Sequence, residues 1–258
     1  MVLKNISDKP LTATPRFLPV GPGGGNLLEL APITLQPGDE ELVDSTPLEQ
    51  VAAQNEAFRR VGVHIRNSSE KGTLIGSLAS FNRAERLSFE IPLRDSGSLR
   101  NSGGSYPIRL DEDYSTFVSL MNVSNETVEF AGYIKHAQGE YVFRPRKVAA
   151  GESVLFDIRD MREKKTPDVH GHPLPADFDR GQFNWSMYNG GAVPKLIGRS
   201  QVVSKRHGVS ASYSCPIFSV SLNGQSTTVR VNCIVYTNTD VTVTDVTSQG
   251  TNVTCQGP

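Results

Sequence analysis

The stretch Asp168-Val169-His170-Gly171-His172 contains residue types at a spacing that could bind a metal ion. Two imidazoles separated by one residue on an extended segment can project to the same side, and the Asp168 carboxylate could complete the ligand set. Prolines and a glycine surround the two histidines, and this composition favours an exposed polar loop. A metal-dependent site at Asp168, His170 and His172 is therefore one hypothesis, and a loop without chemistry is the favoured alternative.

Aromatic side chains suggest a second kind of chemistry, the binding of a carbohydrate or a similar ligand. Trp185, Tyr188 and Tyr141 are the candidate ligand-binding residues, because exposed aromatic rings at one end of a β-sandwich can form a binding platform. Trp185 is the only tryptophan, and a tryptophan on a strand is more often part of the core in sandwich domains. The core interpretation of Trp185 is favoured, and the ligand platform is the alternative.

Other motifs do not indicate catalysis. The glycine-rich stretch Gly21-Pro22-Gly23-Gly24-Gly25-Asn26 lacks the Gly-Lys-Ser/Thr ending of a phosphate-binding loop, so it predicts a hairpin loop. His64, His136 and His207 have no companion serine, cysteine or carboxylate in a recognisable nucleophile setting. We therefore expect a protein that is not an enzyme and that has no cofactor.

The three cysteines, Cys215, Cys233 and Cys255, all lie in the last fifth of the chain. In an oxidising compartment a disulfide is most plausible between Cys233 and Cys255, which would leave one free thiol. Free buried thiols are the alternative. The sequence has no Cys/His spacing typical of a zinc site.

Composition limits the possible partners. The 258 residues include 26 basic and 27 acidic side chains, and this balance gives no general electrostatic attraction to nucleic acid. No run approaches the roughly 18 to 20 apolar residues that a membrane-spanning helix needs. Met1-Val2-Leu3-Lys4-Asn5 leads into a polar turn rather than into the apolar core of a signal peptide. We expect no nucleic-acid partner and no membrane span in this chain.

The sequence repeats itself. The stretch VLKNISDKPLTATPRFL, from Val2, matches VSLMNVSNETVEFAGYI, from Val118, and Asn5 and Ser7 of the first match Asn122 and Ser124 of the second. Further along, Gly38-Asp39 matches Gly151-Glu152, and Leu74-Ile75-Gly76 matches Leu196-Ile197-Gly198. Because the matches keep their order while the loops between them differ in length, the sequence predicts a duplicated domain.

The matched blocks alternate polar and apolar residues with a period of two, which predicts short strands separated by turns rich in Gly, Pro, Asn and Asp. Such strands bury one apolar face each by packing two antiparallel sheets together. We therefore expect an all-β chain of two tandem immunoglobulin-like antiparallel β-sandwiches, with one or two helical turns near Thr46 and Asp157. The predicted boundaries are a first copy over residues 1–100, a linker over 101–114, a second copy over 115–216 and a β-rich tail or truncated third unit over 217–258.

Three blocks also carry a resemblance, namely Gly181-Gln182-Phe183-Asn184-Trp185, Leu196-Ile197-Gly198-Arg199 and Ser214-Cys215. Together with the repeats over about residues 1–216, they resemble a tandem segment of large, uncharacterised bacterial proteins that look exported. The resemblance implies an extracellular β-sandwich array, secreted or on the cell surface, and it implies no activity and no functional residue.

These observations favour a non-catalytic module of adhesion type, acting as a spacer or an interaction scaffold for a protein or glycan partner. The alternatives are a ligand-binding accessory module that uses exposed aromatic rings and a metal-dependent site at His170 and His172. The oligomeric state is left open by the sequence.

Overall fold

The computed structural model describes most of the chain. It covers residues 1–258 except 21–26, 56–60, 71, 83–86, 94–102, 188–195, 205, 207, 215, 223–224, 231–232, 238–240 and 245–258. For the strand residues 80–82, 87–91, 209, 211–214 and those between 216 and 244, only the backbone is described. The described chain is mostly β-strand in antiparallel sheets, as expected, with two short helices.

The first half of the chain forms two sheets. Its elements are β1 (Val2–Asn5), β2 (Leu11–Pro19), β3 (Leu28–Glu29), β4 (Ile33–Leu35), β5 (Glu40–Leu42), α1 (Thr46–Gln54), β6 (Val61–Asn67), β7 (Leu74–Asn82) and β8 (Leu87–Pro92). Sheet A has the strand order β5-β1-β7-β8. In sheet B, β3 and β4 pair with one edge of β2, and β6 pairs with the other.

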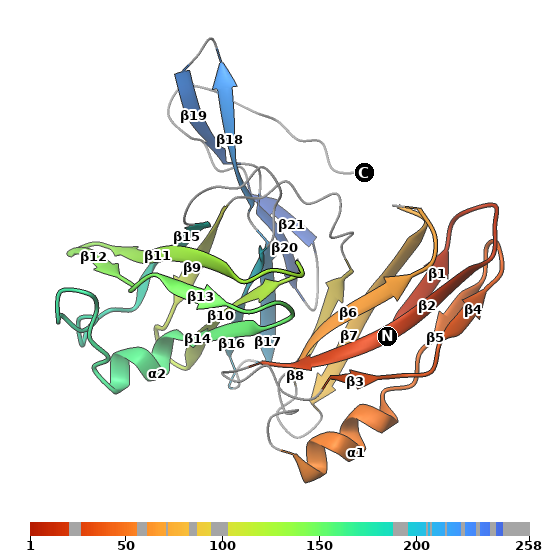
Figure 1. The fold of residues 1–258 in the computed structure, drawn as a ribbon. Coiled ribbons are helices and arrows are strands. Elements are labelled where there is room, and N and C mark those ends of the chain that lie inside the picture. Colours follow the sequence, from red (N-terminus) through yellow and green to blue (C-terminus); the bar gives the residue numbers. More distant parts are fainter. Residues whose placement is uncertain are drawn as a thin grey trace.

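The second half also forms two sheets. Its elements are β9 (Gly103–Arg109), β10 (Tyr114–Asn122), β11 (Val128–His136), β12 (Gly139–Val142), β13 (Arg146–Val148), β14 (Ser153–Asp157), α2 (Ile158–Glu163), β15 (Arg180–Met187), β16 (Leu196–Ser204) and β17 (Val209–Ser214). Sheet D begins β14-β10-β16-β17, and in sheet C β12 and β13 pair with one edge of β11 while β15 pairs with the other. Figure 1 shows the two halves side by side, the first in red to orange-yellow and the second in green to cyan.

The two halves share one strand order. Strands β1 to β8 take the same places as β10 to β17, so that β6 corresponds to β15 and β7 to β16. The pairing register agrees as well. Phe17 and Ile134 are equivalent in the repeat, since each follows the matched asparagine by the same number of residues, and Phe17 lies opposite Val63 while Ile134 lies opposite Phe183. Val63 and Phe183 are therefore equivalent positions, and so are Ile65 and Trp185.

The second half has one additional strand. Strand β9 pairs along seven residues of β15, and its Tyr106 and Ile108 side chains are buried. Residues 103–109 thus belong to sheet C, which corrects the expectation of a linker over residues 101–114. The linker prediction was wrong because it relied on composition. Gly103, Gly104 and Ser105 are typical of a flexible linker, but they are buried strand residues.

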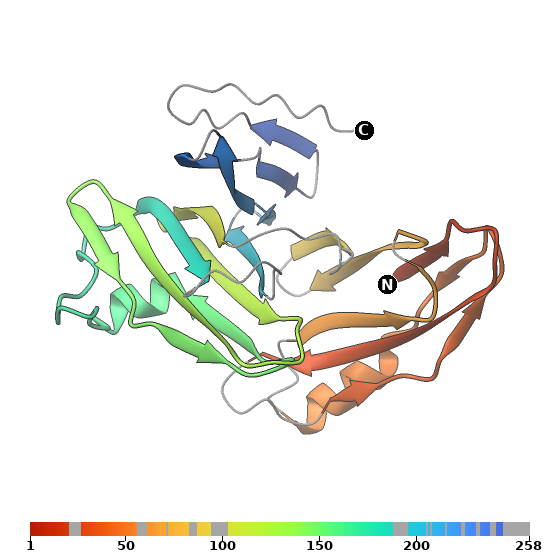
Figure 2. The ribbon, with the colours of Figure 1, turned by 45° about the horizontal axis from the view of Figure 1, so that its top comes forward.

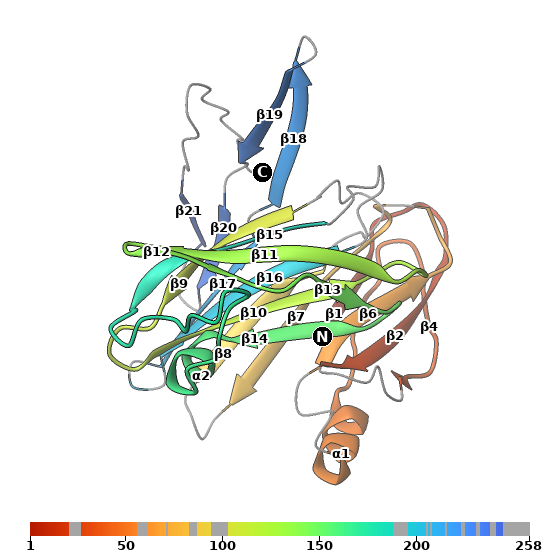
Figure 3. The same cartoon turned by 60° about the vertical axis from the view of Figure 1, so that its left-hand side comes forward.

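The described strands after residue 215 extend both sheets of the second half. They are β18 (Pro216–Leu222), β19 (Gln225–Arg230), β20 (Cys233–Thr237) and β21 (Val241–Thr244). Strand β18 pairs with β9 at two residues before it continues into a hairpin with β19, whereas β20 pairs with β17 and β21 with β20. Figure 3 shows the β18–β19 hairpin projecting away from the sandwiches. In the described part of the chain, no helix is long and apolar enough to cross a membrane.

Among the residues whose side chains are described, the larger buried cluster lies in the second half. There, seventeen side chains are buried in one cluster, among them Phe130, Phe183 and Trp185. The described residues of the first half contribute five, which are Leu3, Leu11, Ala13, Leu35 and Val43. Figure 2 shows the two-layered arrangement of both halves.

The repeated Leu-Ile-Gly phrase opens β7 and β16. Its glycine is needed for space, because a Cβ at Gly198 would collide with the Tyr106 hydroxyl and the Trp185 indole. In the first half a Cβ at Gly76 would collide with the backbone oxygen of Val2 on the neighbouring strand. Neighbouring atoms therefore approach this glycine closely in both halves.

The two short helices lie at equivalent places, as predicted. Helix α2 begins after Asp157, whose carboxylate accepts a hydrogen bond from the backbone N–H of Asp160 at 3.1 Å. Helix α1 has Ser45 rather than Thr46 at its N-terminal cap, and Thr46 donates instead to the Asp44 carboxylate through its backbone N–H and its hydroxyl.

One buried asparagine in each half connects two hairpin turns. The Asn122 amide nitrogen donates to the carbonyls of Glu126, Val148 and Ala149, and its Oδ1 accepts from the backbone and hydroxyl of Ser124. Asn5 makes the equivalent bonds to Lys9, Leu35 and Ser7. Both side chains are fully buried. Each asparagine thereby joins the turn that follows its own strand to a second turn, which lies between β4 and β5 in the first half and between β13 and β14 in the second.

We predict that Asn122→Ala lowers the free energy of unfolding by about 2–4 kcal/mol, because it leaves buried carbonyl groups without donors. Urea denaturation followed by circular dichroism measures this change. Ser124→Ala is the matched control and should cost less than about 1 kcal/mol, since it removes only hydroxyl bonds at the edge of the same cluster. Equal effects of the two substitutions would contradict a special role of the asparagine.

Candidate functional site

Asp168 lies in the loop between α2 and β15, and its carboxylate is almost fully buried. Oδ1 accepts hydrogen bonds from the backbone N–H groups of His170 and His172, both at 2.8 Å. Oδ2 accepts from the backbone N–H of Val142 on β12 at 3.4 Å. The carboxylate therefore connects the loop to the edge strand of sheet C.

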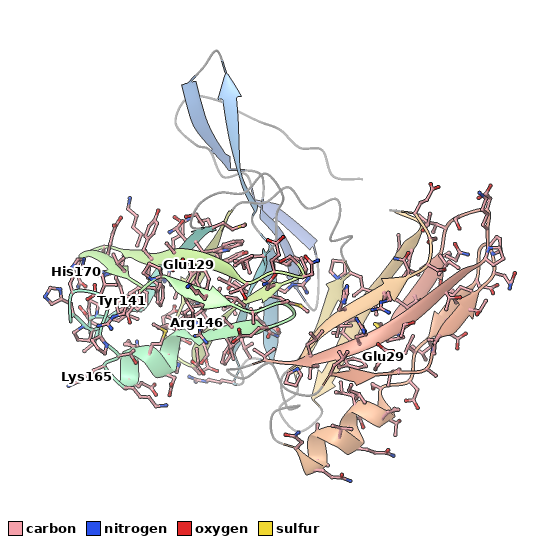
Figure 4. All side chains as sticks on the ribbon, in the orientation of Figure 1. Glu29, Glu129, Tyr141, Arg146, Lys165 and His170 are labelled. Carbon is pink, nitrogen blue, oxygen red and sulfur yellow. The ribbon has the colours of Figure 1, made fainter. Side chains whose placement is uncertain are left out.

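The loop backbone closes tightly around this carboxylate. The Asp168 N–H donates to the His172 carbonyl, and Pro167 and Pro173 form an isolated antiparallel β-bridge. Gly171 supplies the positive φ of 85° that the turn requires. The His170 and His172 side chains are exposed, and Figure 4 shows the His170 ring pointing away from the sheets.

The structure does not support the predicted metal site. Among the residues that the structure describes, no three His, Cys, Asp or Glu side chains are grouped so that they could hold a metal ion. Asp168 does not complete a ligand set with the imidazoles, because its oxygens accept backbone N–H groups. The short spacing of the motif is that of a side chain-capped turn.

The same hydrogen bonds set the charge state of Asp168. Burial alone would raise the pKa of this carboxyl, but the N–H groups of His172, His170 and Val142, with the nearby His170, outweigh it and lower the pKa. Asp168 therefore contributes stability at neutral pH in its ionised form.

The candidate aromatic residues do not form an exposed platform. Trp185 is 3% exposed, and its indole N–H donates to the Tyr106 hydroxyl at 3.2 Å inside the core. Tyr141 is 4% exposed and donates its hydroxyl to the Pro167 carbonyl at 3.2 Å. Burial, and then the Asp168 charge, raise the pKa of Tyr141. The carbohydrate platform at Trp185 and Tyr141 is thus corrected to core packing, which agrees with the favoured interpretation of Trp185.

Three other predicted residues cannot be compared with the structure. Tyr188 and Cys255 lie outside the described residues, and only the backbone of Cys233 is described. The predicted Cys233–Cys255 disulfide stays a prediction.

The structure contains a cleft that the sequence did not predict. It measures about 530 Å³ and lies between the two halves, and every residue of β6 lines it. Leu74 and Leu78 of β7 lie on one side, and Met121 of β10 and Ile197 of β16, on the outer face of sheet D, lie on the other. A weak signal was present in the repeat, since Val63 and Ile65 are smaller than the aromatic residues Phe183 and Trp185 at the equivalent positions. The cleft is the best candidate for a functional site.

Comparisons with known proteins give no further guidance. No family model matches the chain, and no curated protein or solved structure shows significant similarity to it.

We predict that Asp168→Ala lowers the melting temperature at pH 7, because three backbone N–H groups lose their acceptor. A carboxyl group whose pKa is lower in the folded than in the unfolded protein stabilises the fold at pH values above its unfolded-state pKa. This stabilisation is lost as the pH falls through the folded-state pKa. The difference in melting temperature between the native protein and Asp168→Ala should therefore shrink below about pH 4. Thermal melts from pH 7 to pH 3 measure it, with the exposed Asp177→Ala as control. A difference that stays constant or widens on acidification would refute this role.

Proposed function

We propose that the chain is a pair of immunoglobulin-like β-sandwiches that arose by internal duplication. The support is the common strand order of the two halves, their common pairing register, and the equivalent hydrogen bonds of Asn5 and Asn122. Antiparallel strands arranged in two layers are typical of such domains.

The proposed role is that of a non-catalytic structural module, acting as a spacer or an interaction scaffold. The observation that carries it is the packing between the halves. The first half places Gly62 of β6 against Met121 and Ser153 on the outer face of sheet D, and Leu18 of β2 against Gly151. Arg199 of β16 donates to the Pro92 carbonyl at 3.4 Å. These contacts favour a pair with one fixed orientation, which a spacer needs in order to keep a defined reach.

The setting of the module is part of the proposal. A secreted or cell-surface protein follows from the resemblance of the repeated blocks to exported bacterial proteins, and the partner would be another polypeptide or a glycan. A non-catalytic role is supported by the use of Asp168, Tyr141 and Trp185 in packing and turn formation.

We predict that the two halves tumble as one body. Residual dipolar couplings of backbone amides from residues 1–82 and from residues 103–204 should fit a single alignment tensor with equal magnitude for both sets. Two tensors of clearly different magnitude would show that the halves swing, and the module would then be a tether instead of a spacer.

Gly62→Val tests the packing that holds the halves together. A Cβ at Gly62 would already lie 3.1 Å from the Met121 sulfur, so the larger branched side chain should separate the halves. Gly62→Ala is the matched control, because the flexible Met121 can move away from a single methyl group. We expect the common tensor to be lost in Gly62→Val and kept in Gly62→Ala.

A further inference from the structure

The two halves differ at the edge of one strand. In the second half, β9 pairs antiparallel with the edge of β15 that faces away from β11. In the first half, the equivalent strand β6 pairs with β2 on one side, and none of the described strands pairs with its other side. All strands from β1 to β8 already hold the places taken by β10 to β17. A strand that pairs with β6 as β9 pairs with β15 would therefore have to be a strand other than β1 to β8.

The difference is visible in the burial of equivalent side chains. Phe183 is 0% exposed and Trp185 is 3% exposed, since Tyr106 of β9 stacks on Phe183 and accepts a hydrogen bond from Trp185. Val63 and Ile65, at the same positions of β6, remain partly exposed and line the cleft. The side chains that β9 covers in the second half are thus left open in the first.

The backbone of β6 also directs groups to the cleft that no described strand pairs with. Ser68, just past β6, donates its backbone N–H to the Thr12 carbonyl, which fixes the alternation along the antiparallel pair of β2 and β6. Gly62, His64 and Arg66 therefore direct their N–H and C=O groups to β2. Those of Val61, Val63 and Ile65 point to the cleft, where an added strand would find them.

Two other outer strands, β5 and β12, are protected against such pairing. Strand β5 has three residues, two of them glutamates, and β12 has four residues with an exposed Glu140. Short length and charged side chains are common ways to prevent edge pairing. Strand β6 has seven residues and the sequence VGVHIRN, without proline or an acidic residue. Its edge has the features of a strand that accepts a partner.

We infer that the cleft along β6 is a strand-acceptor site that binds an extended segment of another polypeptide chain by β-strand addition. The occupant has the chemistry of β9: a large apolar residue at the places of Tyr106 and Ile108, opposite Val63 and Val61, and a small residue at the place of Gly104, opposite Ile65. Backbone hydrogen bonds would provide affinity and the alternate side chains would provide specificity. This inference rests on the proposed scaffold function and names its partner.

Charge favours a neutral or acidic residue at the polar position of the occupant. In the second half this position is Ser105, whose hydroxyl donates to Oδ1 of Asn184 at 2.9 Å. The equivalent of Asn184 is His64, and Arg66 also lines the cleft. Burial, followed by the charges of Arg16 and Arg66, lowers the pKa of His64 and favours its neutral form. A carboxylate at this position of the occupant would be attracted by the positive charge of Arg66.

The test uses the full chain and an acetylated, amidated peptide with the sequence of residues 103–110, Gly-Gly-Ser-Tyr-Pro-Ile-Arg-Leu. Amide hydrogen exchange is followed residue by residue with NMR. Without peptide, the amides of Val61, Val63 and Ile65 should exchange fast, and those of Gly62, His64 and Arg66 slowly. At a peptide concentration ten times its Kd, exchange of the first three should slow by about tenfold, because opening then requires release of the peptide.

Val63→Pro is the decisive variant, since it removes an N–H that points to the cleft and leaves the bonds between β6 and β2 in place. It should weaken peptide binding by about tenfold or more. Val63→Thr is the matched control and should bind the peptide, because it keeps the N–H and the branched side chain. A peptide with Asp at the places of Tyr106 and Ile108 should give no protection of the Val61, Val63 and Ile65 amides in the native protein. This comparison can be made even if Val63→Pro fails to fold.

Three results would overturn the inference. The first is an absence of protection at millimolar peptide, and the second is protection that spreads equally to Gly62, His64 and Arg66. The third is protection of Val61, Val63 and Ile65 before any peptide is added, which would mean that another part of the chain or a second copy covers the edge. None of these results would change the alignment tensors of the two halves, so failure of the acceptor site and failure of the spacer function can be told apart.

Discussion

Both halves of the protein depend on a buried carboxamide that ends the central strand of one sheet. Strands β1 and β10 each finish in an asparagine at a point where two hairpin turns leave carbonyl groups inside the sandwich. A carboxamide has two donor hydrogens and an accepting oxygen, so one side chain can satisfy both turns at once. An apolar residue would leave these carbonyls unpaired, and a carboxylate would repel them. The asparagine thereby holds both turns against the end of its strand in each half.

The described strands of the two halves cover equivalent core positions to different extents. In the second, β9 closes the side of the sandwich, and this is why large aromatic rings can fill its core. The first has Val63 and Ile65 at those places and a smaller buried cluster among the described residues. The open side faces the outer surface of sheet D, whose Met121 and Ile197 form a wall without filling the gap. An incomplete sandwich and a neighbouring wall together produce the cleft.

Much of the β-structure could be predicted from the sequence, because the period of two and the repeated Asn-x-Ser and Gly-acidic turns are local signals. Strand β9 could not, since Gly103, Gly104 and Ser105 have the composition of a linker. They form a strand by pairing with the distant β15, where Gly104 leaves room for the Trp185 and Tyr106 side chains. The metal hypothesis failed for a related reason. The spacing of Asp168, His170 and His172 reflects a carboxylate that accepts backbone N–H groups two and four residues ahead. Sequence spacing cannot distinguish this arrangement from a ligand set.

The candidate site differs in kind from those that the sequence suggested. Searches for motifs find side chains that could do chemistry, and here Asp168, Tyr141 and Trp185 all take part in folding. In the described part of the chain, the groups that no strand pairs with or covers fully are the outward backbone groups of β6 and its partly buried aliphatic side chains, which have no motif. It becomes visible only when β6 is compared with β15, because the second half shows which strand completes the same edge. An internal repeat with one complete and one incomplete copy thus serves as its own reference, and the strand present in one copy describes the ligand of the other.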